Sequence, residues 1–162
     1  TYSLNLNFGW KGLRLGLLFQ GVGKTDGYLN TYYVMPSNQG GTFRKERLDW
    51  ASAENPNGKT PRLTSANKNN WYDSSFWMKS AAYLRLKNIQ LGYTLPERIS
   101  MKFGVKRFKI YFNAQNLLTF SNCSFIDPES SEFGSNMNSG GANSGRNYPN
   151  LRYFGAGLNI TF

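Results

Sequence analysis

The sequence predicts an all-β chain in which about five antiparallel strands belong to a large transmembrane β-barrel with long extracellular loops. Apolar and polar residues alternate over 84–95 and 107–118, as they do in a strand with one apolar face. Both runs have 12 residues, whereas a strand tilted across a bilayer needs about 9–11 and an ordinary strand about 5–6. The composition agrees with a barrel, because 16% of the residues are aromatic and 17 are glycine while mean hydropathy is −0.52.

The first two strands form a predicted hairpin. Apolar residues at every second position predict strands over 1–9 and 13–22, with Leu18 on the polar parity as an exception. The residues between them, 10–12, predict a tight turn, because Gly12 can supply a positive φ.

The third predicted strand, 77–95, contains a change of parity. Leu84 and Leu86 alternate on one parity, and the apolar residues from Ile89 onward lie on the other. One extra residue at the step between Lys87 and Asn88, in a β-bulge, would restore a single apolar face.

Two further strands are predicted at 107–119 and 151–162. The connection 96–106 precedes the first of them and begins with Pro96, which suits the first position of a helical turn. The chain therefore predicts three strands after its first hairpin.

The segments 23–76 and 120–149 are long and polar and hold no long periodic run. Residues 43–53 predict a short helix. A further strand within residues 28–35 would raise the predicted number of strands above five. The second long segment is rich in Ser, Asn and Gly, which is typical of a mobile loop.

Connection lengths orient the sheet, because membrane barrels have short periplasmic turns and long extracellular loops. The connections at 10–12 and 96–106 are short, so they are predicted on the periplasmic side, together with the end of the last strand. An aromatic girdle is expected near that interface, and its predicted members are Phe8, Trp10, Tyr93, Phe108 and Phe162.

Charge and composition argue against several classes of function. The net charge is +10, from 19 basic and 9 acidic residues, but the basic residues are scattered and form no helical stripe of the kind that binds nucleic acid. A surface that faces anionic lipopolysaccharide explains the charge as well. No run approaches the roughly 18 apolar residues of a transmembrane helix.

No catalytic or metal-binding arrangement is visible. The chain has no histidine and a single cysteine, Cys123, which makes a zinc site or an internal disulfide unexpected. A glycosidase needs two carboxylates on opposite sides of the scissile bond. The acidic pairs Glu46/Asp49 and Asp127/Glu129 are candidates for this role only because they are close in sequence. The run 21–25 (GVGKT) lacks the first glycine of a phosphate-binding loop. We therefore predict no catalytic, cofactor-binding or metal-binding residue, no cofactor and no nucleic-acid partner.

The order of several segments resembles one protein family, the SusC/RagA-like TonB-dependent outer-membrane transporters, and specifically the C-terminal end of such a protein. The matching segments are RLDWASAENPNGKTPRL, SFWMKSAAYLRLKN, YLRLKNIQLGYTLP, IYFNAQNLLTF, FIDPE and the final GLNITF. They occur in the family's order and cover nearly all of the 162 residues. Each segment alone is unspecific, but the combination is specific.

The resemblance implies a nutrient importer, for glycans or peptides, in the outer membrane of Bacteroidetes-type bacteria. Such an importer is a plugged barrel of about 22 strands. Residues 1–162 would be a C-terminal portion of that barrel, without the plug domain and the remaining strands. The implied partners are the remainder of the same barrel, a SusD-like surface lipoprotein, the TonB complex through the absent N-terminal part, and outer-membrane lipid.

Aromatic residues supply the candidate contact sites. Trp50, Trp71, Tyr72 and Tyr148 lie in the long segments, where they could stack on a sugar ring or contact the lipoprotein, although packing within the loop is the simpler explanation for each. The terminal Phe162 resembles the signal that the barrel-assembly machinery reads.

Two other architectures also fit parts of the pattern. A secreted, carbohydrate-binding β-sandwich would show alternating strands and loop aromatics, but shorter strands. A small self-contained barrel would need an even strand count in most bacterial cases. The sequence does not choose a substrate for the transporter.

Overall fold

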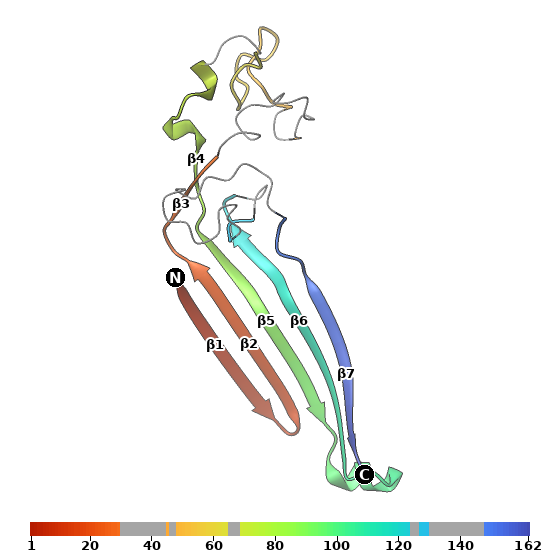
Figure 1. Cartoon of the computed structure of the whole chain (residues 1–162). Coiled ribbons are helices and arrows are strands. Elements are labelled where there is room, and N and C mark those ends of the chain that lie inside the picture. Colours follow the sequence, from red (N-terminus) through yellow and green to blue (C-terminus); the bar gives the residue numbers. More distant parts are fainter. Residues whose placement is uncertain (30–44, 46–47, 65–68, 124–126, 130–147) are drawn as a thin grey trace. The chain divides into compact units, whose positions relative to one another are not determined.

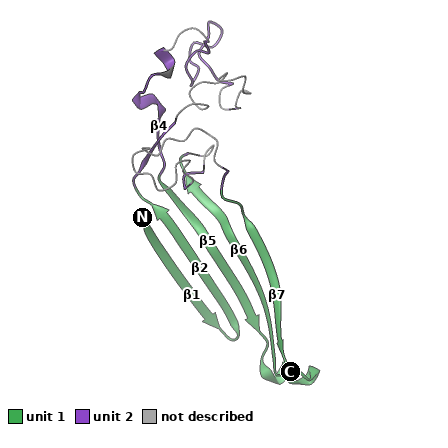
Figure 2. Ribbon diagram, in the orientation of Figure 1, with its two compact units in different colours: residues 1–23, 82–122, 150–162 green, residues 24–81, 123–149 purple. Residues whose placement is uncertain are grey.

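The computed structural model describes residues 1–29, 45, 48–64, 69–123, 127–129 and 148–162. These residues divide into two compact units (Figure 2). Unit 1 comprises residues 1–23, 82–122 and 150–162, and unit 2 comprises residues 24–81 and 123–149.

Unit 1 is built on one antiparallel sheet of five strands in the order β1-β2-β5-β6-β7 (Figure 1). Each strand pairs antiparallel with its neighbours. The strands lie in the sheet in the same order as in the chain. The strands are β1 (Tyr2–Trp10), β2 (Leu13–Val22), β5 (Tyr83–Thr94), β6 (Arg107–Ser121) and β7 (Tyr153–Thr161). The five strands and the all-β class predicted from the sequence are confirmed, with end shifts of a few residues.

The change of parity in the third strand is a β-bulge at Lys87, as predicted. Leu18 and Phe19 are consecutive in β2, yet they pair with Asn88 and Leu86 of β5, so the register of that ladder shifts by one residue at Lys87. The bulge places Leu86 on the same face as the apolar residues that follow it.

Alternate residues of all five strands form one apolar face. One row of paired residues crosses the sheet from Leu6 through Leu17, Ile89 and Ala114 to Phe154. Most of this face is uncovered within unit 1, because side chains such as Phe8, Phe154 and Leu158 are 58%, 62% and 61% exposed. No second sheet packs on it among the described residues of unit 1, which argues against the β-sandwich alternative.

The short connections are ordered and lie at one end of the sheet. Lys11 and Gly12 join β1 to β2 with φ values of 44° and 90°, the left-handed pair that a two-residue hairpin turn requires. A side chain at Gly12 would overlap the carbonyl oxygen of Thr94. Between β5 and β6 lie helix α1 (Glu97–Ser100), with Pro96 at its N-cap, and the 3-10 helix η6 (Met101–Phe103). The predicted turn and helical start are both found.

The structure of unit 2 shows that the predicted boundaries of the third strand are wrong. The strand expected at 77–95 is two elements, because β4 (Met78–Ser80) pairs with β3 (Asp26–Tyr28) in a separate two-stranded sheet. Residues 81–82 separate β4 from β5. The local alternation did not reveal this break, because the partner of β4 lies about 50 residues earlier in the chain.

The short helix expected at 43–53 is wrong for residues 48–53, which instead carry an isolated parallel bridge between Trp50 and Thr60. Residues 43–44 and 46–47 lie outside the described residues. The possible extra strand at 28–35 is tested only at its start, where Tyr28 ends β3 and Leu29 donates its N–H to the Trp77 carbonyl at 3.0 Å.

The described residues of unit 2 also include two 3-10 helices, η4 (Asn69–Trp71) and η5 (Ser75–Trp77). Trp77 is buried, and the ring of Phe76 packs edge-on against it with 4.9 Å between centroids. Among the described residues of the whole chain, no helix has the length and apolar character needed to cross a membrane.

Candidate functional site on the polar face of the sheet

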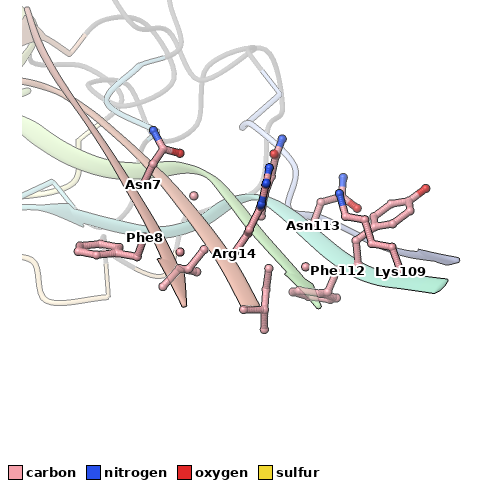
Figure 3. A pocket seen from close by; sticks show the side chains of 13 residues that line it. Asn7, Phe8, Arg14, Lys109, Phe112 and Asn113 are labelled. Carbon is pink, nitrogen blue, oxygen red and sulfur yellow. The ribbon is translucent and has the colours of Figure 1, made fainter. Parts of the chain in front are cut away.

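The face of the sheet opposite the apolar one is hollowed. The hollow has a volume of about 800 Å³, and its polar lining comes from β1, β2, β5 and β6. Figure 3 shows Asn7, Arg14 and Asn113 rising from one side of the ribbon, with Phe112 on the other. The remaining polar lining side chains are Gln90, Lys109 and Tyr111.

Glycines form the floor of the hollow. Strand pairing places Gly9, Arg14, Gly92, Tyr111 and Gly157 in one row across the sheet, so that glycine alternates with a large side chain. A Cβ atom added at Gly157 would overlap the ring of Tyr111, and one added at Gly92 would lie 3.1 Å from Cε of Lys109. The large side chains therefore lie down across their neighbours instead of standing away from the sheet.

The next row on this face also combines glycines with amide side chains. It runs from Asn7 through Gly16, Gln90 and Asn113 to Gly155. A Cβ atom at Gly155 would overlap the amide of Asn113, and one at Gly16 would lie 3.2 Å from Oδ1 of Asn7. In both rows the glycines thus leave room for neighbouring side chains to lie across the backbone.

Two cations dominate the electrostatics of the hollow. The side chain of Lys109 lies across Gly92, and Arg14 is the residue of β2 that pairs with Gly92, so both cations line the same hollow. Nζ of Lys109 also lies 5.9 Å from the centroid of the Tyr111 ring, within cation–π range. No acidic residue is among the described residues that line the hollow. The surface therefore favours carboxylates or other anionic groups.

Another arginine of the polar face, Arg85, is buried near the other end of β5. Arg85 is 3% exposed, and its Nε donates a hydrogen bond to Oγ1 of Thr119 at 2.9 Å. Its guanidinium carbon lies 5.8 Å from the Tyr83 ring centroid. Arg85 is thus held in place by β6 and by stacking, which suits a structural role in this face.

Sequence reasoning did not single out these polar-face residues. Their parity was visible in the sequence, because Arg14 and Lys109 occupy positions opposite to the apolar ones. Their proximity depends on the register of β2, β5 and β6, and no local pattern gives that register.

The candidate contact residues predicted from the sequence lie mainly in unit 2. Tyr72 and Tyr148 are 65% and 77% exposed, Trp71 ends η4, and Trp50 is half-buried beside a shallow cavity. Their contact with a substrate or partner is not tested by this geometry and stays a prediction. The same holds for the assembly role of Phe162, whose side chain is 81% exposed after β7.

Side-chain hydrogen bonds hold the backbone around Trp50. Nδ2 of Asn55 donates hydrogen bonds to Oδ1 of Asp49 at 2.9 Å and to the Trp50 carbonyl at 3.3 Å. Oγ1 of Thr60 donates to the Asp49 carbonyl at 3.0 Å. The Asp49 carboxylate therefore holds its own loop together, while its proposed acidic neighbour Glu46 lies outside the described residues.

Two other acidic residues of unit 2 also have structural partners. The backbone N–H of Glu129 donates to Oδ1 of Asp127 at 3.0 Å, as in an Asx turn. The Tyr28 hydroxyl donates to Oδ1 of Asp73 at 2.6 Å, across 45 residues of sequence. Burial, the hydrogen bond to Asp73 and the charge of Asp73 raise the pKa of Tyr28 above its ordinary value, and a backbone hydrogen bond from Ser74 opposes this rise.

The chain is similar along its whole length to longer receptors. It is 30% identical over 166 aligned positions to TonB-dependent receptor P3 of Formosa agariphila, covering 100% of this chain and 16% of that protein. It is 33% identical to TonB-dependent receptor P26 of the same organism, covering 94% of this chain and 16% of that protein. No protein-family model matches.

Solved structures show the same similarity. The RagAB peptide importer in its open-open state superposes with a TM-score of 0.70 at 26% identity, covering 99% of this chain and 17% of that one. Its closed-closed state gives 0.69. The chain thus spans 16% of the length of the first two receptors it matches.

Proposed function

We propose that this chain, which is similar along its whole length to a segment of SusC/RagA-like TonB-dependent transporters, forms part of the barrel wall of a nutrient importer in a bacterial outer membrane. The observation that carries the proposal is the division of the five-stranded sheet into one continuous apolar face and one hollowed polar face. A barrel wall needs both faces, because its outside meets lipid and its inside meets water or protein.

The apolar face suits lipid. Its side chains are too exposed within unit 1 for a soluble core, and they extend over all five strands without a charged residue in the paired rows. Hydrocarbon supports only closed sheets, because each unpaired backbone group there costs several kcal/mol, on the order of a lost buried hydrogen bond.

The two sheet edges support a larger barrel. Among the described residues, β1 pairs only with β2, and β7 pairs only with β6. The outer edges of β1 and β7 can therefore form backbone hydrogen bonds with further strands of the same barrel. We assign residues 1–162 to a portion of that barrel, whose remaining strands and plug lie elsewhere in the protein.

The long segments would face outward. Both leave the sheet at the end opposite the 11–12 turn, as the extracellular loops of a barrel do. Trp50, Trp71, Tyr72 and Tyr148 would there contact the nutrient or a SusD-like lipoprotein. Because the similar solved protein is named a peptide importer, peptides are the first substrate class to test and glycans the second.

The polar hollow would face the barrel interior. Arg14 and Lys109 would then present positive charge to whatever passes through or fills that space, and energy for release would come from the TonB complex through other parts of the protein. Carboxylate groups are the chemistry that such a surface attracts.

The test is purification of the full-length protein from outer membranes in detergent. We expect a large heat-modifiable species, a co-purifying surface lipoprotein, and peptide uptake by cells that depends on TonB. Tyr72→Ala and Trp50→Ala should reduce uptake while the heat-modifiable species persists. A water-soluble, detergent-independent protein would contradict the proposal outright, whereas TonB-dependent uptake of glycans alone would replace only the substrate class.

A further inference from the structure

The connection between β5 and β6 is an ordered element, held by internal hydrogen bonds, and is longer than a minimal turn. Val105 donates its N–H to the Ser100 carbonyl at 3.2 Å, and Gly104, at φ 69°, donates to the Met101 carbonyl at 3.1 Å. Ser100 is 1% exposed, and its hydroxyl lies 3.1 Å from the Glu97 carbonyl and 3.2 Å from the Lys106 carbonyl. These contacts fix the outward surface of the connection.

The outward surface of this connection is apolar. Ile99, Met101 and Phe103 are 44%, 57% and 77% exposed. Ile99 belongs to α1, and Met101 and Phe103 belong to η6, so both helical turns of the connection expose apolar side chains. An ordered element that presents large apolar side chains outward has the property of a membrane-contacting or partner-contacting surface.

The same element is cationic. Arg98, Lys102 and Lys106 are all exposed, and Glu97 is its only acidic residue. The combination of exposed apolar side chains with lysine and arginine is typical of segments that lie in the headgroup layer of a bilayer. Long basic side chains reach the phosphates while their stems stay against the apolar layer.

Neighbouring residues mark this end of the sheet as an interface. The antiparallel order brings the 11–12 turn and the end of β7 to the same end as the connection. Trp10 is 69% exposed, and Nζ of Lys11 lies 5.2 Å from the centroid of its ring. Tryptophan with an adjacent lysine is a common anchor at the boundary between hydrocarbon and water.

We propose that residues 96–106 lie in the headgroup layer of the membrane leaflet on this side and bind anionic phospholipid through Arg98, Lys102 and Lys106. The apolar side chains of Ile99, Met101 and Phe103 enter the acyl boundary. This inference rests on the proposed function, because it requires that the apolar face of the sheet meets lipid. Positive charge favours an anionic partner, and the exposed apolar side chains beside the apolar face favour a lipid surface over an acidic protein or a free phosphate.

The first experiment measures lipid retention by the full-length protein. The protein in detergent is incubated with equal amounts of phosphatidylglycerol and phosphatidylethanolamine, and retained lipid is counted by native mass spectrometry. Each cation near an anionic surface contributes about fivefold, so the triple variant R98Q/K102Q/K106Q should lower the preference for phosphatidylglycerol by roughly a hundredfold.

A matched control carries the same charge change elsewhere. Lys24, Lys59 and Arg62 are exposed residues of unit 2, and their triple change to glutamine should leave the preference unaltered. An equal loss in both variants would mean a nonspecific charge effect and would overturn the proposal. Inorganic phosphate should fail to compete with the lipid; competition by phosphate would assign the site to a free anion.

The second experiment locates the apolar side chains. A polarity-sensitive dye is attached at F103C in a C123S background, and its emission is compared in lipid-free amphipol and in lipid nanodiscs. We expect a blue shift in the nanodisc, and no shift for the dye at K59C. An apolar signal in both environments would mean that other protein covers the connection, and a water-like signal in both would mean that nothing covers it.

Heat-modifiable migration of the same samples separates this inference from the proposed function. A barrel that folds in nanodiscs while the dye at position 103 remains water-like contradicts the inference alone. A protein that never enters nanodiscs contradicts both.

Discussion

Replacing Leu6 by arginine tests whether the apolar face meets hydrocarbon. Leu6 lies at the centre of β1, four residues from either end of the nine-residue strand Tyr2–Trp10. Four residues span about 14 Å along a strand, or roughly 10 Å of height at a tilt near 40°. Because the apolar band of a barrel is about 25 Å tall, Leu6 should sit close to the midplane and Trp10 close to one boundary.

The expected cost follows from that depth. Arginine at the midplane of a lipid face costs about 2–4 kcal/mol, and near the boundary about 0–1 kcal/mol. Leu6→Arg should therefore shift the unfolding equilibrium by roughly 30-fold to 700-fold, and Trp10→Arg by about fivefold at most. Urea unfolding of the full-length protein folded into phospholipid vesicles, followed by heat-modifiable migration, measures both.

Asn5→Arg is the matched control. Asn5 neighbours Leu6 on the opposite face, and its side chain accepts only an exposed hydrogen bond from Asn7 at 3.2 Å. The change should cost about 0.5 kcal/mol or less, as surface substitutions do. An Asn5→Arg variant that loses as much stability as Leu6→Arg, or a Trp10→Arg variant that loses more, would refute the assignment of the apolar face to lipid.

Three further outcomes are expected. Deleting Lys87 removes the bulge and turns the start of β5 over, so the heat-modifiable barrel should not form, while K87A, which keeps the backbone, should fold. Gly157→Ala forces the ring of Tyr111 aside and should cost about 1–3 kcal/mol in urea unfolding, and Tyr111→Ser should restore most of that loss. Because the pKa of Tyr28 is raised above 10.0 in the folded state, its neutral form stabilises the fold below pH 10.0, and this contribution is lost as the pH rises through the folded pKa. Tyr28→Phe should remove one late step from the tyrosinate absorbance titration of the folded protein.

A different result would contradict each of these three predictions. A folded barrel after deletion of Lys87 would mean that strand register slips without penalty. Failure of Tyr111→Ser to rescue Gly157→Ala would mean that the ring is not the obstacle. If Tyr28→Phe removed absorbance from the main tyrosine transition and left the late step in place, the hydrogen bond to Asp73 would not hold the phenol neutral.

Side-chain parity was readable from the sequence because it is a local property of an extended chain. Successive residues of a strand point to opposite faces wherever the strand pairs. The alternation around Leu6 and Leu17 therefore predicted the apolar face, and the slip before Ile89 predicted the bulge at Lys87. The 11–12 turn was predictable for the same kind of reason, because the left-handed backbone of a two-residue turn favours glycine.

Strand partners and the polar hollow were decided only by the tertiary structure. Residues 78–80 have the pattern of the strand that follows, yet they pair with residues 26–28 in another sheet. Arg14 and Lys109 line one hollow because β2, β5 and β6 pair in one particular register, and Gly92 leaves room for the lysine stem. Parity depends on neighbours along the chain, whereas register depends on residues that are distant in sequence. The sequence by itself thus determined which side chains share a face, and the tertiary structure decided which of them meet.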